Sequence, residues 1–536
     1  MKCYDAIVVG GGHNGLVCAA YLARAGLDVL VLERRQVLGG ASVTEELFPG
    51  YRVSTAAYLL SLLQPKVVTD LQLHRFGYHV MPKDPPYFSP RLDGRAFFMW
   101  RDMGRTLAEI AKLSPRDAKR YPEYEAMLDR VTAFVEPLLL QPPSAVPPRR
   151  ALDLLDPVRV AARAAKLPRR ELAEIQRMFT QSAAELLDDW FESEPLKAAL
   201  VTDGVIGANA GPMSPGTAYV LLHHQMGRAA GPRGLWGFVR GGMGAVSLAI
   251  AGADRAAGAE IRTDAPVARI LTRDGTAHGV ALENGDELQA RVVVSNADPK
   301  RTFLRLVEPG VLPPDFVAEV ERYRCEGSSF KLNLAVGELP SWVACPGTTL
   351  GPQHMGTAHV APSVEYVERA WDDAKYGHPS RSPMIEIGIP TAYDPDLAPP
   401  GKHLLSLFVQ YAPYRLAEGS WEQERERFAD RVVALLGEYA PNLPGAIEHR
   451  FALSPVDLEA RFGLTGGHIF HGELSLGQIF ANRPLPGWSR YLTPLRNLYL
   501  CGSGTHPGGG VMGASGHNAA QAVLRARGRR SAAVPD

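Results

Sequence analysis

The chain opens on two short apolar runs joined by a glycine-rich turn and a helical pattern. Residues 4–9 and 27–32 are rich in Val, Ile or Leu, which predicts two buried strands. Between them, small and apolar residues recur at helical spacing and end at a glycine, a helix-stop signal: Leu16, Ala19, Ala20, Ala23 and Gly26. The hydrophobic pattern therefore predicts a strand–turn–helix–strand unit of the α/β class.

The turn in this unit has the spacing of a dinucleotide-binding site. Glycines in a Gly-x-Gly-x-x-Gly arrangement permit a tight turn, let a pyrophosphate approach the backbone and let the helix pack close to the strand. The phosphates would lie on the free N–H groups of the helix start. An acid follows the second strand, where ribose hydroxyls are expected, and it disfavours NADP. The predicted contacts are Gly10, Gly11, Gly12, His13, Asn14, Gly15 and Glu33.

The residues after this acid favour FAD over NAD. A Gly-Gly pair at this offset resembles the extended fingerprint of FAD-binding oxidoreductases, in which the backbone runs close to the cofactor. An ordinary turn is the alternative. The further FAD contacts expected here are Arg34, Gly39, Gly40 and Ala41.

The apolar pattern then leaves this unit and returns to it. Residues 56–68 predict a helix near the cofactor, 106–203 are mostly helical, and 266–295 predict a β-meander. Other predicted elements are a hairpin at 87–100, strands at 330–336, 384–389 and 403–411, and a helix at 421–439. We predict a discontinuous FAD-binding domain and an interleaved α+β substrate domain. The first spans 1–90, 225–300 and 487–530, the second spans 91–224 and 301–486, and 531–536 form a disordered tail.

A second glycine-rich loop, residues 502–516, lies between a strand at 497–501 and a helical pattern at 518–524. Its helix start can face the flavin ring and stabilise charge on the reduced form. His506 is the candidate catalytic residue, as a proton donor or acceptor near the ring. Alternatively, His506 holds the loop through a hydrogen bond. A third glycine stretch, 239–244, precedes a strand that ends in Arg262 instead of an acid, so we expect one dinucleotide.

The composition argues against several classes of function. The 536 residues have a formal net charge of zero and 21% charged side chains, which argues against nucleic-acid binding. The five cysteines are widely spaced and include no Cys-x-x-Cys, which predicts a reducing compartment and no redox dithiol. His468 and His471 have metal-ligand spacing but no further ligands in a recognisable pattern, so no metal is predicted.

No signal peptide or membrane-spanning run is visible, so we expect a cytoplasmic protein. Residues 149–170 are strongly basic, with Arg159, Arg163 and Lys166 on one helical face. Such a helix can lie weakly on an anionic membrane surface; the alternative is a solvated helix face.

Several of these motifs together resemble the bacterial-type phytoene desaturase group of FAD-dependent oxidoreductases, over nearly the whole chain. They are the first glycine motif with Glu33, the stretch 241–244, the strand end 295–298 and the loop 501–516. The resemblance implies a glutathione-reductase-like Rossmann fold for the FAD domain. It also implies FAD contacts at Val267, Asn296, Ala297, Gly502, Ser503, Met512 and Gly513. One departure is Ala41, where carotenoid desaturases usually have arginine.

The sequence thus predicts an FAD-dependent oxidoreductase that moves hydride from an organic substrate to flavin N5. The substrate is expected to be a small, largely apolar molecule, isoprenoid in type, in a pocket between the domains. An amine or amino-acid oxidase is the enzymatic alternative. A flavoprotein with a binding or regulatory role is the alternative from another class. The sequence predicts no particular oligomeric state.

Overall fold

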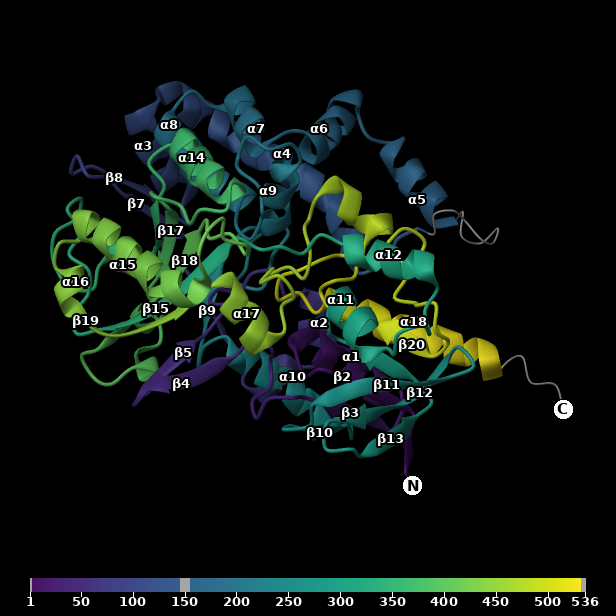
Figure 1. Cartoon of the computed structure of the whole chain (residues 1–536). Helices are drawn as coiled ribbons and strands as arrows, with labels where there is room; N and C mark the ends of the chain where they lie inside the picture. The colour runs from purple at the N-terminus through teal and green to yellow at the C-terminus, as the bar shows by residue number, and fades with distance from the viewer. Residues whose placement is uncertain (1, 145–154, 532–536) are drawn as a thin grey trace.

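The computed structural model describes residues 2–144 and 155–531 (Figure 1). The predicted first unit forms β2 (Ala6–Val9), α1 (His13–Arg24) and β3 (Val29–Leu32). These strands lie inside a five-stranded sheet with the order β10-β3-β2-β14-β20, in which every pairing is parallel. The other three strands are β10 (Glu260–Arg262), β14 (Val293–Ser295) and β20 (Leu498–Leu500).

Both faces of this sheet are covered, which is why its strands are apolar throughout. Ala6 and Val8 pack on a layer of helices, whereas Ile7 and Val9 point to the opposite face. The helices are α1, α10 (Gly244–Ala256) and α18 (Ala514–Ser531). The opposite face carries the predicted meander, in the order β1-β13-β12-β11, and α12 (Pro314–Arg322). The meander strands are β1 (Cys3–Tyr4), β11 (Val267–Arg273), β12 (Thr276–Leu282) and β13 (Glu287–Ala290).

A second, seven-stranded sheet lies on the left of Figure 1, in the order β19-β15-β18-β17-β16-β7-β8. Its outer face is apolar and packs on α15 (Trp421–Tyr439), as the predicted strands and helix of this region require. The strands are β7 (Tyr87–Pro90), β8 (Ala96–Met99), β15 (Ser329–Val336), β16 (Thr357–Val360), β17 (Met384–Gly388), β18 (His403–Gln410) and β19 (Ile447–Leu453).

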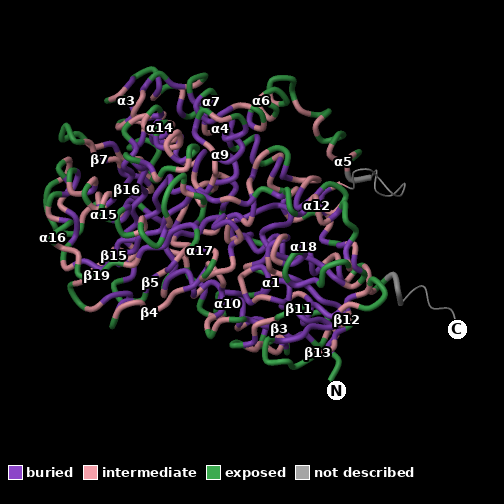
Figure 2. The backbone as a smooth tube through the Cα atoms, in the orientation of Figure 1, coloured by how far each residue is buried: buried purple, intermediate pink, exposed green. Residues whose placement is uncertain are grey.

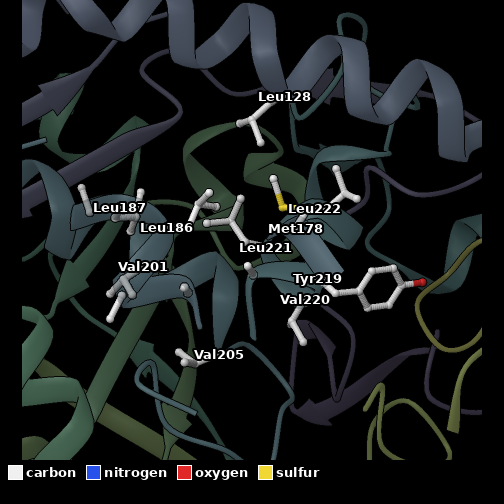
Figure 3. Packing of buried hydrophobic residues seen from close by; sticks show 14 of the residues in the cluster. Leu128, Met178, Leu186, Leu187, Val201, Val205, Tyr219, Val220, Leu221 and Leu222 are labelled. Atoms are coloured by element: carbon white, nitrogen blue, oxygen red, sulfur yellow. The ribbon is translucent and has the colours of Figure 1, made fainter. Parts of the chain in front are cut away.

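A layer of helices completes the molecule at the top of Figure 1. Figure 3 shows its core, where Leu128 of α4, Met178 of α6 and Leu221 of α9 are buried in one cluster. Figure 2 shows that burial is continuous from this layer through both sheets. The helices are α3 (Met103–Leu113), α4 (Pro115–Leu139), α5 (Leu155–Ala164), α6 (Arg169–Thr180), α7 (Ala183–Trp190), α8 (Glu194–Val201), α9 (Thr217–Gln225) and α14 (Val364–Lys375).

Short elements connect these layers. Two are two-stranded antiparallel sheets, the hairpin of β4 (Thr44–Phe48) with β5 (Tyr51–Ser54) and the long-range pair of β6 (Val80–Pro82) with β9 (Gly237–Val239). The short helices are α2 (Pro65–Asp70), α11 (Pro299–Arg301), α13 (Pro352–Met355), α16 (Leu443–Ala446) and α17 (Pro455–Phe462).

The predicted helix at 56–68 is wrong. Only α2, which begins at Pro65, is helical there. Leu60 instead exchanges both backbone hydrogen bonds with Gly237, at 2.9 and 3.0 Å, so the segment is extended beside β9. Its apolar residues are buried by tertiary packing and need no helix to hide them.

The division into two domains remains a proposal. One strand differs from the expected boundary at residue 90, because β7 pairs within the seven-stranded sheet. The expected tail at 531–536 lies outside the described residues, except for Ser531, which ends α18.

Candidate active site

A cavity of about 980 Å³ connects the two sheets. One end is lined by the first glycine turn and Glu33, and the other by side chains of β15, β16, β17 and β18. The predicted contacts on its wall are Gly10, Gly12, His13, Asn14, Glu33, Arg34, Gly39, Gly40, Ala41, Val267, Asn296, Ala297 and Ser503. A cofactor at the glycine turn and a substrate on the seven-stranded sheet would therefore share one continuous cavity.

The glycine turn is shaped as its sequence predicts. Gly10 has φ +100°, a backbone conformation that side chains disfavour. A Cβ at Gly15 would collide with the Gly10 carbonyl oxygen, so the third glycine is required for the helix to pack on the strand end. α1 begins at His13 with no side-chain cap, which leaves its first N–H groups available to an anion.

Glu33 is buried at the end of β3, and backbone groups fix its orientation. One carboxylate oxygen accepts from the Gly11 N–H at 2.8 Å and the other from the Arg35 N–H at 2.9 Å. Each oxygen keeps a further lone pair for a hydroxyl donor. This arrangement fits a ribose.

Two buried polar atoms on this wall lack a protein partner, His13 Nε2 and Asn14 Oδ1. Asn14 also donates to Ser503 Oγ at 3.0 Å, which ties the start of α1 to the C-terminal loop. Burial lowers the pKa of His13 to about 4, so its ring is neutral at pH 7. FAD fits the combination of features at this end of the cavity. They are the glycine turn, the free N–H groups of α1, the oriented carboxylate of Glu33 and these unpaired atoms.

Some predicted contacts lie behind the wall. Gly11 and Gly15 shape the turn without lining the cavity, and Gly502 follows β20. Met512 is buried in a small apolar cluster with Leu62, and a Cβ at Gly513 would meet Val17 and Val67. In the C-terminal loop, Gly510 and Val511 form the cavity surface instead.

His506 is not among the residues that line the cavity, and its predicted catalytic role stays a prediction. It is buried, and its Nε2–H donates to the Leu138 carbonyl of α4 at 2.9 Å. Burial lowers the pKa of His506 to about 4. This geometry fits the alternative, a histidine that holds the loop.

Arg483 is a structural residue that the sequence reasoning missed. It is fully buried, and its guanidinium donates to six backbone carbonyls. The shortest bonds go to Phe470 (2.7 Å), Ser503 (2.8 Å) and Glu473 (2.9 Å). Phe470 and Ser503 line the cavity, so Arg483 holds two parts of its wall together. Its position within a loop gave no signal in the sequence.

The seven-stranded sheet presents a second group that was missed. Lys331, Glu386 and His359 are buried but face the cavity. Burial lowers the pKa of Lys331 to about 7, raises that of Glu386 to about 7 and lowers that of His359 to about 3. A signal did exist, because polar residues occupy alternate positions of these strands, as in Phe-Lys-Leu-Asn-Leu at 330–334.

The part of the chain that the structure describes has no paired cysteines and no cluster of side chains suited to a metal ion. All five cysteines are free, and burial raises the pKa of Cys501 well above its ordinary value. In residues 2–144 and 155–531, no three His, Cys, Asp or Glu side chains gather as a metal site would require.

Comparison with known proteins identifies the family of this chain. The chain matches the model of the flavin containing amine oxidoreductase family over residues 15–524. It is 44% identical to mouse pyridine nucleotide-disulfide oxidoreductase domain-containing protein 2, over 97% of this chain and 93% of that protein. It is 26% identical to the lycopene-forming phytoene desaturase of Pantoea ananas, over 96% and 98% of the two chains.

Among solved structures, cyclohexylamine oxidase from Brevibacterium oxydans shares the fold, with a TM-score of 0.55 at 15% identity. That alignment covers 99% of this chain and 100% of the oxidase. The predicted Rossmann-type fold and the predicted cofactor are therefore confirmed. The chain belongs to the flavin containing amine oxidoreductase family and is an FAD-dependent oxidoreductase.

Proposed function

We propose that this enzyme oxidises a small organic molecule held in the chamber between the FAD end of the cavity and the seven-stranded sheet. The observation that carries the proposal is the single cavity, which runs from Glu33 and Gly12 to Lys331 and Glu386 without a dividing wall. When bound, FAD supplies the acceptor for a hydride equivalent at N5.

The chain's own residues would orient the substrate and exclude water. Apolar and aromatic side chains form much of the chamber, among them Met99, Leu128, Leu221, Phe408 and Phe470. They support the expected substrate with a largely apolar body. Lys331 Nζ, held by Asn333 Oδ1 at 2.8 Å and Ser406 Oγ at 2.7 Å, has a pKa suited to holding or releasing a proton at neutral pH.

Amine oxidation is the second candidate. The rings of Tyr58 and Phe408 stack at 6.1 Å on the cavity wall, and Lys331 Nζ lies 5.1 Å from the Tyr58 centroid. Aromatic faces of this kind attract a cationic amine. Carboxylates at Asp203 and Glu386 on the same wall would add to that attraction.

Anaerobic reduction of the purified yellow protein tests the proposal. Matched apolar alkenes, alcohols and amines are added in turn, and loss of the oxidised flavin absorbance is followed. Bleaching by one class identifies the substrate class. A flavin that no organic compound reduces, but dithionite does, would favour the binding or regulatory alternative.

We also propose weak contact with an anionic membrane surface through residues 138–170, of which 145–154 lie outside the described residues. In α5, Val158 is exposed, but Arg163 donates to the Phe134 carbonyl and lies 5.1 Å from the Phe134 ring. No helix in the described part of the chain is long and apolar enough to cross a membrane. Liposome flotation at low salt tests the contact, and an Arg159→Glu/Arg163→Glu variant that floats equally well would contradict it.

A further inference from the structure

Four neighbouring strands of the seven-stranded sheet place one row of side chains on the cavity floor. Lys331 pairs with Phe408, Phe408 with Glu386, and Glu386 with His359. Residues directly opposite one another on adjacent strands point to the same face of a sheet. All four side chains line the cavity, and we call them the floor row.

The opposite face of the same strands is apolar. Its side chains pack against helix α15 and include Phe330, Leu332, Ile385 and Ile387. A sheet that is covered on both faces normally buries apolar residues on both. The polar floor row therefore departs from what packing alone requires, which indicates a ligand.

Three polar atoms at one end of the floor row are buried and have no partner. They are Glu386 Oε2, His359 Nδ1 and the Tyr87 hydroxyl. The relative exposure of these residues is 4%, 5% and 8%. They come from the adjacent strands β17, β16 and β7, and the rings of Tyr87 and His359 lie 4.6 Å apart. All three residues line the cavity.

Both basic and acidic side chains surround these atoms. Lys83, Lys331, Glu386 and Asp203 line the same cavity wall, and the pKa of Lys331 and that of Glu386 both lie at about 7. Lys83 donates to Thr357 Oγ1, and Lys331 donates to the neutral oxygens of Asn333 and Ser406. An ammonium ligand would meet Lys83, and a carboxylate ligand would meet Glu386.

A neutral hydroxyl has both the donor and the acceptor lone pairs that these three free atoms lack as partners. It donates one hydrogen bond, which the carboxylate oxygen of Glu386 needs, and it accepts others, which Tyr87 and neutral His359 can donate. An ammonium group can only donate and a carboxylate can only accept. We propose that this end of the floor row binds the hydroxyl group of an alcohol with an apolar body. This inference rests on the proposed function in one respect: the apolar part of the alcohol is taken to extend toward the FAD end of the cavity.

Calorimetric titration of the FAD-loaded protein with three ligands of equal chain length tests the site. The ligands are 1-octanol, octylamine and octanoate at neutral pH, where the last two are charged. We expect 1-octanol to bind at least tenfold more tightly than either ion. Tighter binding of octylamine or octanoate, or no detectable binding of 1-octanol, would overturn the proposal.

Variants locate the binding on the floor row. Glu386→Leu removes the acceptor and should weaken 1-octanol binding ten- to hundredfold, the range for a hydrogen bond to a charged group. Glu386→Gln keeps an acceptor oxygen and should lose less. Asp254→Asn changes another buried carboxyl, on α10 and away from the cavity, and should leave the affinity unchanged.

Equal 1-octanol affinity in the wild type and Glu386→Leu would contradict the assignment. The visible FAD spectrum is recorded for each variant, and an unchanged spectrum shows that the fold and cofactor are intact. A wild type without FAD would overturn the oxidoreductase proposal, while the alcohol titration would still report on the floor row.

Discussion

Replacing Arg483 with methionine should detach the two wall segments that its guanidinium joins. Methionine keeps an apolar stem of similar length but removes every hydrogen bond to the six carbonyls. All of these bonds except the one to Glu473 are buried, so water does not readily replace the lost donors.

The magnitude follows from the three shortest bonds, to Phe470, Ser503 and Glu473. Hydrogen bonds to a charged group contribute about 1.5–3 kcal/mol each, and part of that is offset because the methionine variant no longer buries a charge. We expect a loss of about 3–5 kcal/mol in the free energy of unfolding. This is a large share of the roughly 5–15 kcal/mol that stabilises a typical fold.

Urea unfolding, followed by circular dichroism and by the fluorescence of released flavin, measures the change. Arg496→Met is the matched control, because Arg496 also bonds a carbonyl (Asp274, 2.8 Å) but is exposed, and it should cost less than about 1 kcal/mol. Arg483→Lys keeps the charge with fewer donors and should recover part of the loss. An Arg483→Met protein within 1 kcal/mol of the wild type, with flavin release at the same urea concentration, would refute the reasoning.

Three further predictions address the turn, the loop and pH. Gly15→Ala should abolish FAD binding, because the added methyl collides with the Gly10 carbonyl; a variant that purifies with full FAD would disprove this. His506→Ala should lower stability by about 1 kcal/mol through the lost bond to Leu138 while leaving the flavin reduction potential unchanged, and a shifted potential would restore its proton role. The free energy of unfolding should decrease as pH falls from about 6.5 toward 4, because histidines in the unfolded chain bind protons in this range and the buried, neutral histidines do not. Those with the pKa lowered to about 3 or 4 are His13, His223, His359, His468 and His506, and each contributes to this loss of unfolding free energy. A flat profile of unfolding free energy over this range would contradict the burial of these rings as neutral groups.

The dinucleotide end of the site could be predicted because its determinants are local. Gly10, Gly15 and Glu33 lie within one strand–helix–strand unit, where backbone sterics dictate the turn and the parallel pairing brings the acid beside it. The meander and the strands at 330–336 and 403–411 were predicted from apolar runs and from turn residues such as Asp274-Gly275 and Asn284-Gly285, which are also local signals. The segment at 56–68 was wrongly predicted as a helix because local pattern does not show tertiary contacts. Its apolar residues lie in an extended segment that is buried by parts of the chain distant in sequence.

Tertiary structure alone decided which side chains meet across long separations. Asn14 bonds Ser503 because two glycine loops converge at the same end of the parallel sheet. Arg483 has a structural role only because folding brings six carbonyls around its guanidinium. His506 lies in the predicted loop, and only the tertiary structure brings its Nε2 to the Leu138 carbonyl of α4. The floor row is the clearest case. The sequence alternates polar and apolar residues in β15, but only strand order and register placed Lys331, Glu386 and His359 in one row, because pairing between strands is a non-local choice.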